Sequence, residues 1–143
     1  MKKQRVVLVS GNFNVLHPGH LRLLRFAKEC GDRLMVAVLS DRITGPASHV
    51  PEQLRLEGVQ SNLWVDDAFI VDEPVEMLVR RLRPDIVVKG KEHEHGPNPE
   101  LPELEAYGGR LLFGSGEIAF SSLDLIRKEF RDFDPRSIRL PAE

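Results

Sequence analysis

The sequence is poor in the residues on which several classes of protein depend. It has one cysteine, Cys30, which excludes an internal disulfide and a zinc cluster built from cysteines. It has one tryptophan, one tyrosine and no basic patch interleaved with aromatic residues, which disfavours a nucleic-acid-binding module. No apolar run reaches the roughly 18 residues of a membrane-spanning helix. These absences predict a cytoplasmic protein whose partners include neither nucleic acid nor membrane.

The composition that is present fits one ordinary soluble domain. The chain has 143 residues, of which 41% are hydrophobic and 29% charged, and its formal net charge is −2. That balance excludes a polycation held on nucleic acid by net charge alone, but it leaves a local anion site open. We expect a single domain over residues 1–131. Residues 132–143, with two prolines, then form a tail or a linker.

Apolar runs and amphipathic stretches alternate along the chain. Strands are expected over 6–10, 34–39, 68–71, 85–88 and 110–113, and helices over 18–30, 51–60, 74–82 and 121–131. The segments 42–50 and 91–102 are expected to be loops, and 104–107 a single helical turn. Such an alternation predicts an α/β fold, a Rossmann-like doubly wound parallel sheet with helices on both faces.

The segment from Gly11 to His20 follows the first expected strand and enters the first helix. Ligands of open α/β sheets bind at the carboxyl ends of the strands, and a helix start presents free N–H groups to an anion. His17 and His20 are three residues apart across this helix start, so both can face the same point. Two imidazoles there would donate hydrogen bonds to a phosphate. The alternative is a polar cap and a core histidine.

The string Gly11-Asn-Phe-Asn-Val-Leu-His-Pro-Gly-His20 resembles the H-x-G-H signature of the nucleotidyltransferase superfamily that includes the cytidylyltransferases. Asn14 stands where the family pattern G-T-F-D-x-x-H-x-G-H has an aspartate. Further stretches resemble family motifs, namely residues 27–34, 84–90, 107–109 and 120–122. The resemblance covers residues 5–131. The pattern is most similar to that of the nucleotidyltransferase domain of bacterial ADP-heptose synthase.

The resemblance implies transfer of a nucleoside monophosphate from a nucleoside triphosphate to a phosphorylated acceptor such as a sugar phosphate, with release of pyrophosphate. It implies His17 and His20 as catalytic residues and Mg²⁺ as cofactor, with no protein side chain assigned as a direct metal ligand. The implied nucleotide-binding residues are Gly11, Asn12, Phe13, Gly19, Lys89, Ser121 and Ser122. The residues implied near the acceptor or metal are Asn14, Asp41, Arg55 and Glu92.

Two of these assignments have structural alternatives. Arg55 would pair with Glu52 or Glu57 on its own helix if it does not contact phosphate. Lys89 would be a solvated lysine at the end of a strand. Trp64 is expected in packing or in a subunit contact.

The departures from the family pattern bear on the substrate. Segment 42–50 has no lysine, and only Arg42 and His49 offer a substitute. The arginine that cytidylyltransferases carry before the closing serine motif is absent from 116–119. This favours ATP over CTP, with a CTP-dependent enzyme acting on a polyol phosphate as the alternative. A non-catalytic nucleotide sensor is a further alternative.

Two further expectations concern metals and partners. The histidines at 17, 20, 93 and 95, with Glu92 and Glu94, offer a metal site as a rival interpretation. The resemblance also implies a homodimer. The tail at 132–143 would be a dimer arm, or a linker to a partner domain such as a sugar kinase.

Overall fold

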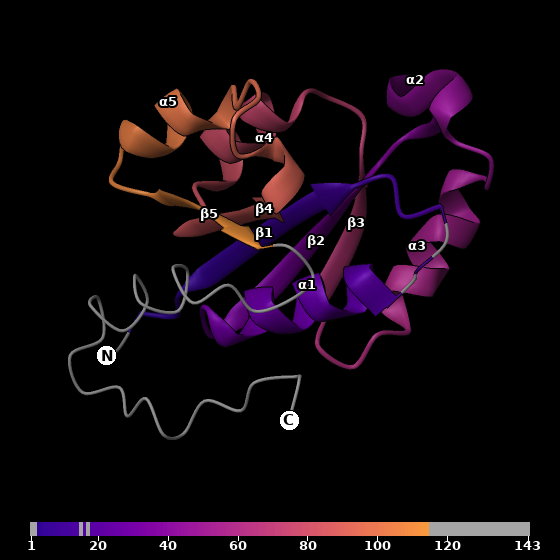
Figure 1. The fold of residues 1–143 in the computed structure, drawn as a ribbon, viewed down its shortest axis with the longest axis horizontal. Coiled ribbons are helices and arrows are strands. Elements are labelled where there is room, and N and C mark those ends of the chain that lie inside the picture. Colours follow the sequence, from indigo (N-terminus) through magenta and orange to yellow (C-terminus); the bar gives the residue numbers. More distant parts are fainter. Residues whose placement is uncertain (1–2, 15, 17, 115–143) are drawn as a thin grey trace.

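The computed structural model describes residues 3–14, 16 and 18–114 of the chain (Figure 1). Its strands are β1 (Val6–Gly11), β2 (Arg33–Leu39), β3 (Asp67–Val71), β4 (Ile86–Gly90) and β5 (Arg110–Gly114). Its helices are α1 (Pro18–Glu29), α2 (Asp41–Thr44), α3 (Glu52–Gln60), α4 (Val75–Leu82) and α5 (Glu100–Glu105). Two short 3₁₀ turns, η1 (Gly45–Ala47) and η2 (Lys91–His93), complete the described elements.

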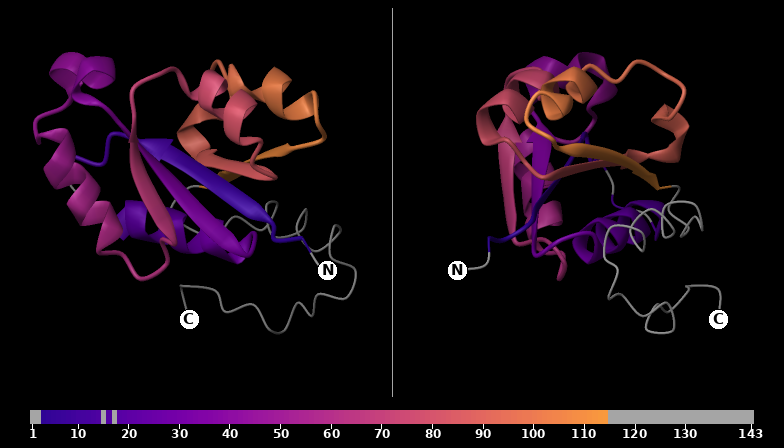
Figure 2. Two further views of the ribbon diagram at one scale, coloured as in Figure 1. Left: turned by 180° about the vertical axis from the view of Figure 1, so that it is seen from behind. Right: turned by 90° about the vertical axis from the view of Figure 1, so that its left-hand side faces the viewer.

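The strands form one parallel sheet in the order β3-β2-β1-β4-β5. Helices α1 and α3 pack on one face, while α4 and α5 pack on the other, as the views from behind and from the side show (Figure 2). β1 is therefore the central strand: β2 and β3 extend the sheet on one side of it, and β4 and β5 extend it on the other. The prediction of a Rossmann-like doubly wound α/β domain is confirmed.

The central strands are buried on both faces because their side chains alternate between two apolar clusters. In β1, Val7 and Val9 pack with the helices α1 and α3, whereas Leu8 packs with α4 and α5. All three side chains are at most 1% exposed. This is why β1 is a continuous apolar run in the sequence instead of an alternating one.

The expected loop at 42–50 proved partly helical. Ser40 caps α2, because its Oγ accepts a hydrogen bond from the N–H of Ile43 at 3.2 Å, and η1 follows directly. The expected loop at 91–102 also ends early, because α5 begins at Glu100. Pro102 fits there because a proline in the first helical turn removes no hydrogen bond.

Several residues of the family-like motifs hold the sheet together. The Asp85 carboxylate accepts the N–H of Val6 at 2.8 Å and so ties the start of β4 to β1. The Tyr107 hydroxyl donates to the Pro84 carbonyl oxygen at 2.6 Å. Trp64 is half-buried against the apolar cluster under α1 and α3, which confirms the expectation of packing.

The expected helix at 121–131 and the tail at 132–143 lie outside the described residues, so the boundary at 131 stays a prediction. Within the part of the chain that the structure covers, no helix has the length and apolar character needed to cross a membrane.

Candidate nucleotide-binding site

A cavity of about 710 Å³ opens where β1, β2 and β4 end. The chain leaves β1 toward β2 on one side and β4 lies on the other, so this is the point at which the strand order reverses. Ligands of doubly wound sheets bind in the crevice at that point. The cavity is lined by Ser10, Gly11, Asn12, Phe13, Asn14, His20, Leu39, Val75, Glu76, Lys89, His93, Pro99 and Glu100.

The loop after β1 has an unusual backbone conformation at Phe13. This residue has a φ of 54°, in the left-handed region, which costs a non-glycine residue about 1–3 kcal/mol and occurs preferentially at functional sites. Its ring is buried and meets the His20 ring edge to face, with 5.7 Å between the ring centroids. A Cβ atom at Gly11 would lie 3.2 Å from the Phe13 ring. Gly11 therefore lets Phe13 pack where it sets the position of His20.

The start of α1 faces the same cavity. Pro18 and Gly19 occupy the first turn, which contains no acidic residue, and His20 lines the cavity. The free N–H groups and the positive end of the helix dipole favour an anion there. His17, together with Ser121 and Ser122, lies outside the described residues, so the roles assigned to these three residues stay predictions.

Lys89 is the penultimate residue of β4 and lines the cavity. Its Nζ donates to Asn98 Oδ1 at 2.7 Å and to Glu100 Oε1 at 3.1 Å. An ammonium group has three N–H donors, so these two bonds leave one for a ligand. The side chain is 17% exposed, and Glu100 is more deeply buried still. Lys89 is therefore not a solvated lysine.

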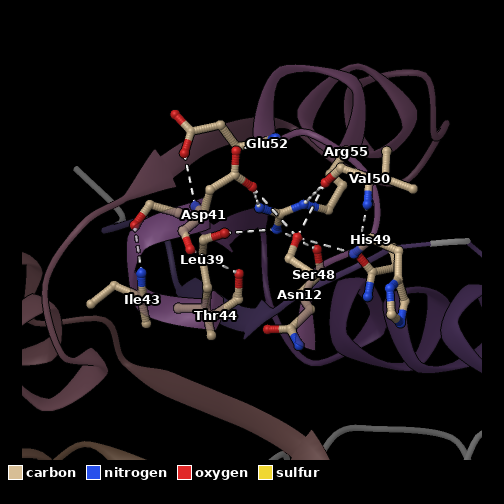
Figure 3. Close-up of polar contacts among 12 residues, drawn as sticks. Asn12, Leu39, Asp41, Ile43, Thr44, Ser48, His49, Val50, Glu52 and Arg55 are labelled. Atoms are coloured by element: carbon tan, nitrogen blue, oxygen red, sulfur yellow. Dashed lines mark hydrogen bonds and ion pairs between the residues drawn. The ribbon is translucent and has the colours of Figure 1, made fainter. Parts of the chain in front are cut away.

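Arg55 of α3 is buried and does not line the cavity, but it contacts two lining residues, Asn12 and Leu39. Figure 3 shows its contacts. Its guanidinium donates to the carbonyl oxygens of Val50, Asn12 and Leu39 at 2.8, 2.8 and 2.7 Å. It also donates to Asp41 Oδ1 at 2.7 Å, and this bond lowers the pKa of the Asp41 carboxyl below its usual range. The pairing of Arg55 with Glu52 or Glu57 is not what the structure shows.

Asn14 joins the loop after β1 to segment 47–50. Its Nδ2 donates to the Ala47 carbonyl oxygen at 2.8 Å, and its Oδ1 accepts the N–H of His49 at 3.1 Å and the Ser48 hydroxyl at 3.4 Å. An aspartate, which the family pattern has here, cannot donate to a carbonyl oxygen. The side-chain amide of Asn14 thus holds segment 47–50 next to the loop after β1, which lines the cavity.

Arg42, considered in place of the missing lysine, is paired away from the cavity, and the described residues considered for a metal do not gather into one site. Arg42 pairs with Asp72 at the end of β3, with Nε 2.9 Å from Oδ1. Glu92 is exposed and is not a lining residue, although its carboxylate lies 3.6 Å from His93 Nε2 in the wall. Among the residues that the structure describes, no three His, Cys, Asp or Glu side chains gather as a metal site.

Sequence reasoning missed four polar residues of this site, Ser10, Glu76, Asn98 and Glu100. Glu76 is the second residue of α4 and has no motif around it. Asn98 and Glu100 lie in the polar stretch 91–102, where composition indicates solvent exposure. No signal in the sequence gives the burial of Glu100, because burial depends on β4 and α5 meeting in space.

The fold, the loop after β1 and the histidine at the start of α1 together define a nucleotidyltransferase-type α/β domain. A family model described as cytidylyltransferase-like matches residues 8–104, and the chain belongs to this family. The expectation of a nucleotidyltransferase is confirmed at that level.

Among individual proteins, the chain is similar to Bifunctional protein HldE of several bacteria. The protein from Gluconobacter oxydans is 36% identical over 115 residues, which are 76% of this chain and 24% of that protein. The protein from Koribacter versatilis is 36% identical over 132 residues, 87% of this chain and 27% of that protein. The chain thus spans about a quarter of the length of these curated relatives.

Two solved structures have the same fold. The lipopolysaccharide core biosynthesis protein from Thermoplasma volcanium superposes with a TM-score of 0.67 at 26% identity, over 79% of this chain and 98% of that one. A protein of unknown function from Archaeoglobus fulgidus gives a TM-score of 0.64 at 21% identity, over 77% of this chain and 89% of that one.

Proposed function

We propose that this chain transfers a nucleoside monophosphate from a nucleoside triphosphate, ATP in preference to CTP, to a phosphorylated small molecule such as a sugar phosphate. The observation that carries the proposal is the cavity at the reversal of strand order, where the Phe13 loop, His20 and Lys89 meet. The similarity to HldE proteins along most of the chain supports it. The missing arginine at 116–119 favours ATP.

The reaction forms one bond and breaks one. An oxygen of the acceptor phosphate attacks the α-phosphorus, the bond from that phosphorus to the bridging oxygen breaks, and pyrophosphate leaves with the electron pair. The backbone at Asn12 and Phe13, the start of α1 at Gly19 and the Lys89 ammonium bind the phosphates. His17 and His20 stabilise the charge that develops in the transition state. Ser121 and Ser122 bind the β- and γ-phosphates.

Magnesium fits this proposal as an ion that arrives with the nucleotide. Mg²⁺ keeps several waters and is commonly bound by substrate phosphates with one or two carboxylates. Glu76 lines the cavity, whereas Glu100 is engaged with Lys89 and Asp41 with Arg55. When bound, the ion neutralises phosphate charge.

Asn14, Asp41, Arg55 and Glu92 lie on the acceptor side in this proposal. Asn14 donates to the Ala47 carbonyl oxygen, and Arg55 donates to the Val50 carbonyl oxygen and to the Asp41 carboxylate. These three residues therefore shape that side of the site by holding the backbone of 47–50. The Glu92 side chain is 72% exposed beside His93, and in this proposal it contacts the acceptor from the rim of the site.

The test is pyrophosphate release in the presence of magnesium. ATP, CTP, GTP and UTP are each combined with sugar 1-phosphates, heptose 1-phosphate and glycerol 3-phosphate. Release with one pair, lost in His17→Ala and in His20→Ala, is the expected result. Nucleotide binding without release for any pair favours the sensor, and preference for CTP with a polyol phosphate favours the cytidylyltransferase alternative. A folded chain that binds no nucleotide contradicts the proposal.

The remaining expectations are proposals of the same kind. The relatives are more than three times as long as this chain and are called bifunctional, which supports a second activity beside this one, and a sugar kinase is the expected candidate. A homodimer is expected, and light scattering of the purified chain checks it. The cytoplasmic location rests on the single cysteine.

A further inference from the structure

Arg55 carries a charge, yet its side chain is completely buried. A buried guanidinium is stable only when its donors are paired. Here the four bonds go to four different segments, namely the loop after β1, the end of β2, the start of α2 and Val50, two residues before α3. Two of these acceptors, Asn12 and Leu39, line the cavity, although Arg55 itself is not in its wall.

The bond from Arg55 to the Asn12 carbonyl oxygen has a consequence for the next residue. In a trans peptide the C=O of one residue and the N–H of the following residue point in opposite directions, and none of the described peptide bonds is cis. Since the Asn12 C=O is turned toward Arg55, the Phe13 N–H is turned away from it. In the part of the chain that the structure covers, this N–H donates no hydrogen bond.

The strain at Phe13 adds to the argument. A positive φ at a bulky residue persists only when the surroundings determine it. The Arg55 bond fixes the peptide on one side of Phe13, and the His20 ring packs on its side chain. Without the Arg55 bond, the peptide is free to rotate and the Phe13 ring to leave His20.

We propose that Arg55 is a positioning residue, whose bond to the Asn12 carbonyl keeps the Phe13 N–H turned into the cavity as a phosphate donor and keeps Phe13 against His20. This inference rests on the proposed nucleotidyl transfer and deepens it. In this inference Arg55 does not contact the substrate; it acts by fixing the backbone between Asn12 and Phe13.

The first variant is Arg55→Lys in the full chain. Lysine keeps the charge but cannot reach four acceptors, because it lacks the planar fork of the guanidinium. The matched control is Arg33→Lys, which alters an exposed ion pair with Asp67 at the opposite end of β2. Loss of one preorganised donor typically lowers kcat by about 10²–10³-fold. We therefore expect such a fall in kcat for Arg55→Lys, with the KM for nucleotide changed less than fivefold, and wild-type values for the control.

A second readout needs no turnover. The chain has seven phenylalanines, so selective ¹⁵N labelling of phenylalanine gives an NMR spectrum with few amide peaks. The peak that disappears in a Phe13→Tyr variant is that of the Phe13 amide. Titration with inorganic pyrophosphate and with ATP should shift this amide in the wild type and in Arg33→Lys. In Arg55→Lys the shift should be lost. If that variant does not fold, Asp41→Asn removes an anionic partner of Arg55 and should reduce the shift in part.

The outcomes separate the two proposals. A Phe13 amide that responds in the wild type and not in the variant supports the positioning role, even where no acceptor yields pyrophosphate and nucleotidyl transfer fails. If neither pyrophosphate nor ATP shifts the Phe13 amide of the wild type, the positioning role is overturned. A folded Arg55→Lys chain with the wild-type response, or with kcat within threefold of wild type, overturns it as well.

Discussion

The buried pair of Lys89 and Glu100 gives a prediction in which stability and affinity change in opposite directions. Glu100 is 3% exposed, and its carboxylate lies 3.1 Å from the Lys89 Nζ. Removing one partner of a buried pair typically costs about 3–5 kcal/mol, because the other charge is left uncompensated. Glu100→Gln keeps an acceptor oxygen, so we expect the lower end, about 3 kcal/mol. For a chain of this size this lowers the melting temperature by about 10 °C.

The same substitution should tighten nucleotide binding. It removes a negative charge beside the ammonium that faces the cavity. At a distance of about 6 Å, a carboxylate and a phosphate repel by roughly 1–3 kcal/mol at effective dielectric constants of 20–40. We therefore expect the dissociation constant for ATP to fall by about tenfold.

Urea unfolding followed by the fluorescence of Trp64 measures the first effect, and calorimetric titration with ATP measures the second. Glu103→Gln is the matched control, since Glu103 lies on the same helix α5 and pairs with the exposed Arg80. It should leave the urea midpoint and the affinity close to those of the wild type. Equal losses of stability in the two variants, or weaker ATP binding in Glu100→Gln, would refute the reasoning.

Three further predictions use other parts of the molecule. Asn14→Asp places an oxygen against the Ala47 carbonyl oxygen, so the KM for the acceptor should rise more than the KM for nucleotide. Gly11→Ala crowds the Phe13 ring, so kcat should fall by tenfold or more at nearly unchanged far-ultraviolet circular dichroism. Burial raises the pKa of the Cys30 thiol to about 12, so thiol reagents at pH 8 should react only as fast as the chain unfolds.

Each of these predictions has a control variant or an outcome that would contradict it. Gly58→Ala fills open space on α3, with its nearest neighbour 4.0 Å away, and should not lower kcat. For Asn14, equal changes in the two KM values would contradict the assignment to the acceptor side. For Cys30, the raised pKa means that the free energy of unfolding falls as pH rises from about 9 toward 12, since only the unfolded thiol then ionises. Rapid labelling of the native chain would contradict the burial.

The fold was predictable to the extent that burial leaves a pattern in the sequence. The central strands are apolar on both faces, so β1 and β2 appear as continuous apolar runs and are predicted to within a residue at most ends. Helix α2 was missed because its four residues are too short for a periodic pattern. Its one signal was Ser40, which caps it. The end of α4 at Leu82 matches the predicted range, and Arg83 follows it in the left-handed conformation, directly before Pro84.

The site was predictable where a local motif carries it and not where distant segments meet. The Phe13 loop and His20 are found together in one short string, and the structure places both in the cavity wall. The network of Arg55 had no such signal, because three of its acceptors are backbone carbonyl oxygens that any residue type offers. Since every residue has a backbone carbonyl, the residue types in a sequence do not indicate which carbonyl oxygens will accept hydrogen bonds from an arginine.

The central place of β1 in the sheet has a consequence for synthesis. Val6 bonds to Asp85, which lies 79 residues further along the chain, and β4 covers that edge of β1. At about 5–20 residues per second, the ribosome needs roughly 4–16 s to deliver this partner. During that interval β1, β2 and β3 can pair with one another. The backbone N–H and C=O groups on the other edge of β1 remain unpaired and can bond to a strand of another chain. A chaperone that shields this apolar edge would raise the yield of folded chain, and slower translation between β3 and β4 would lower it.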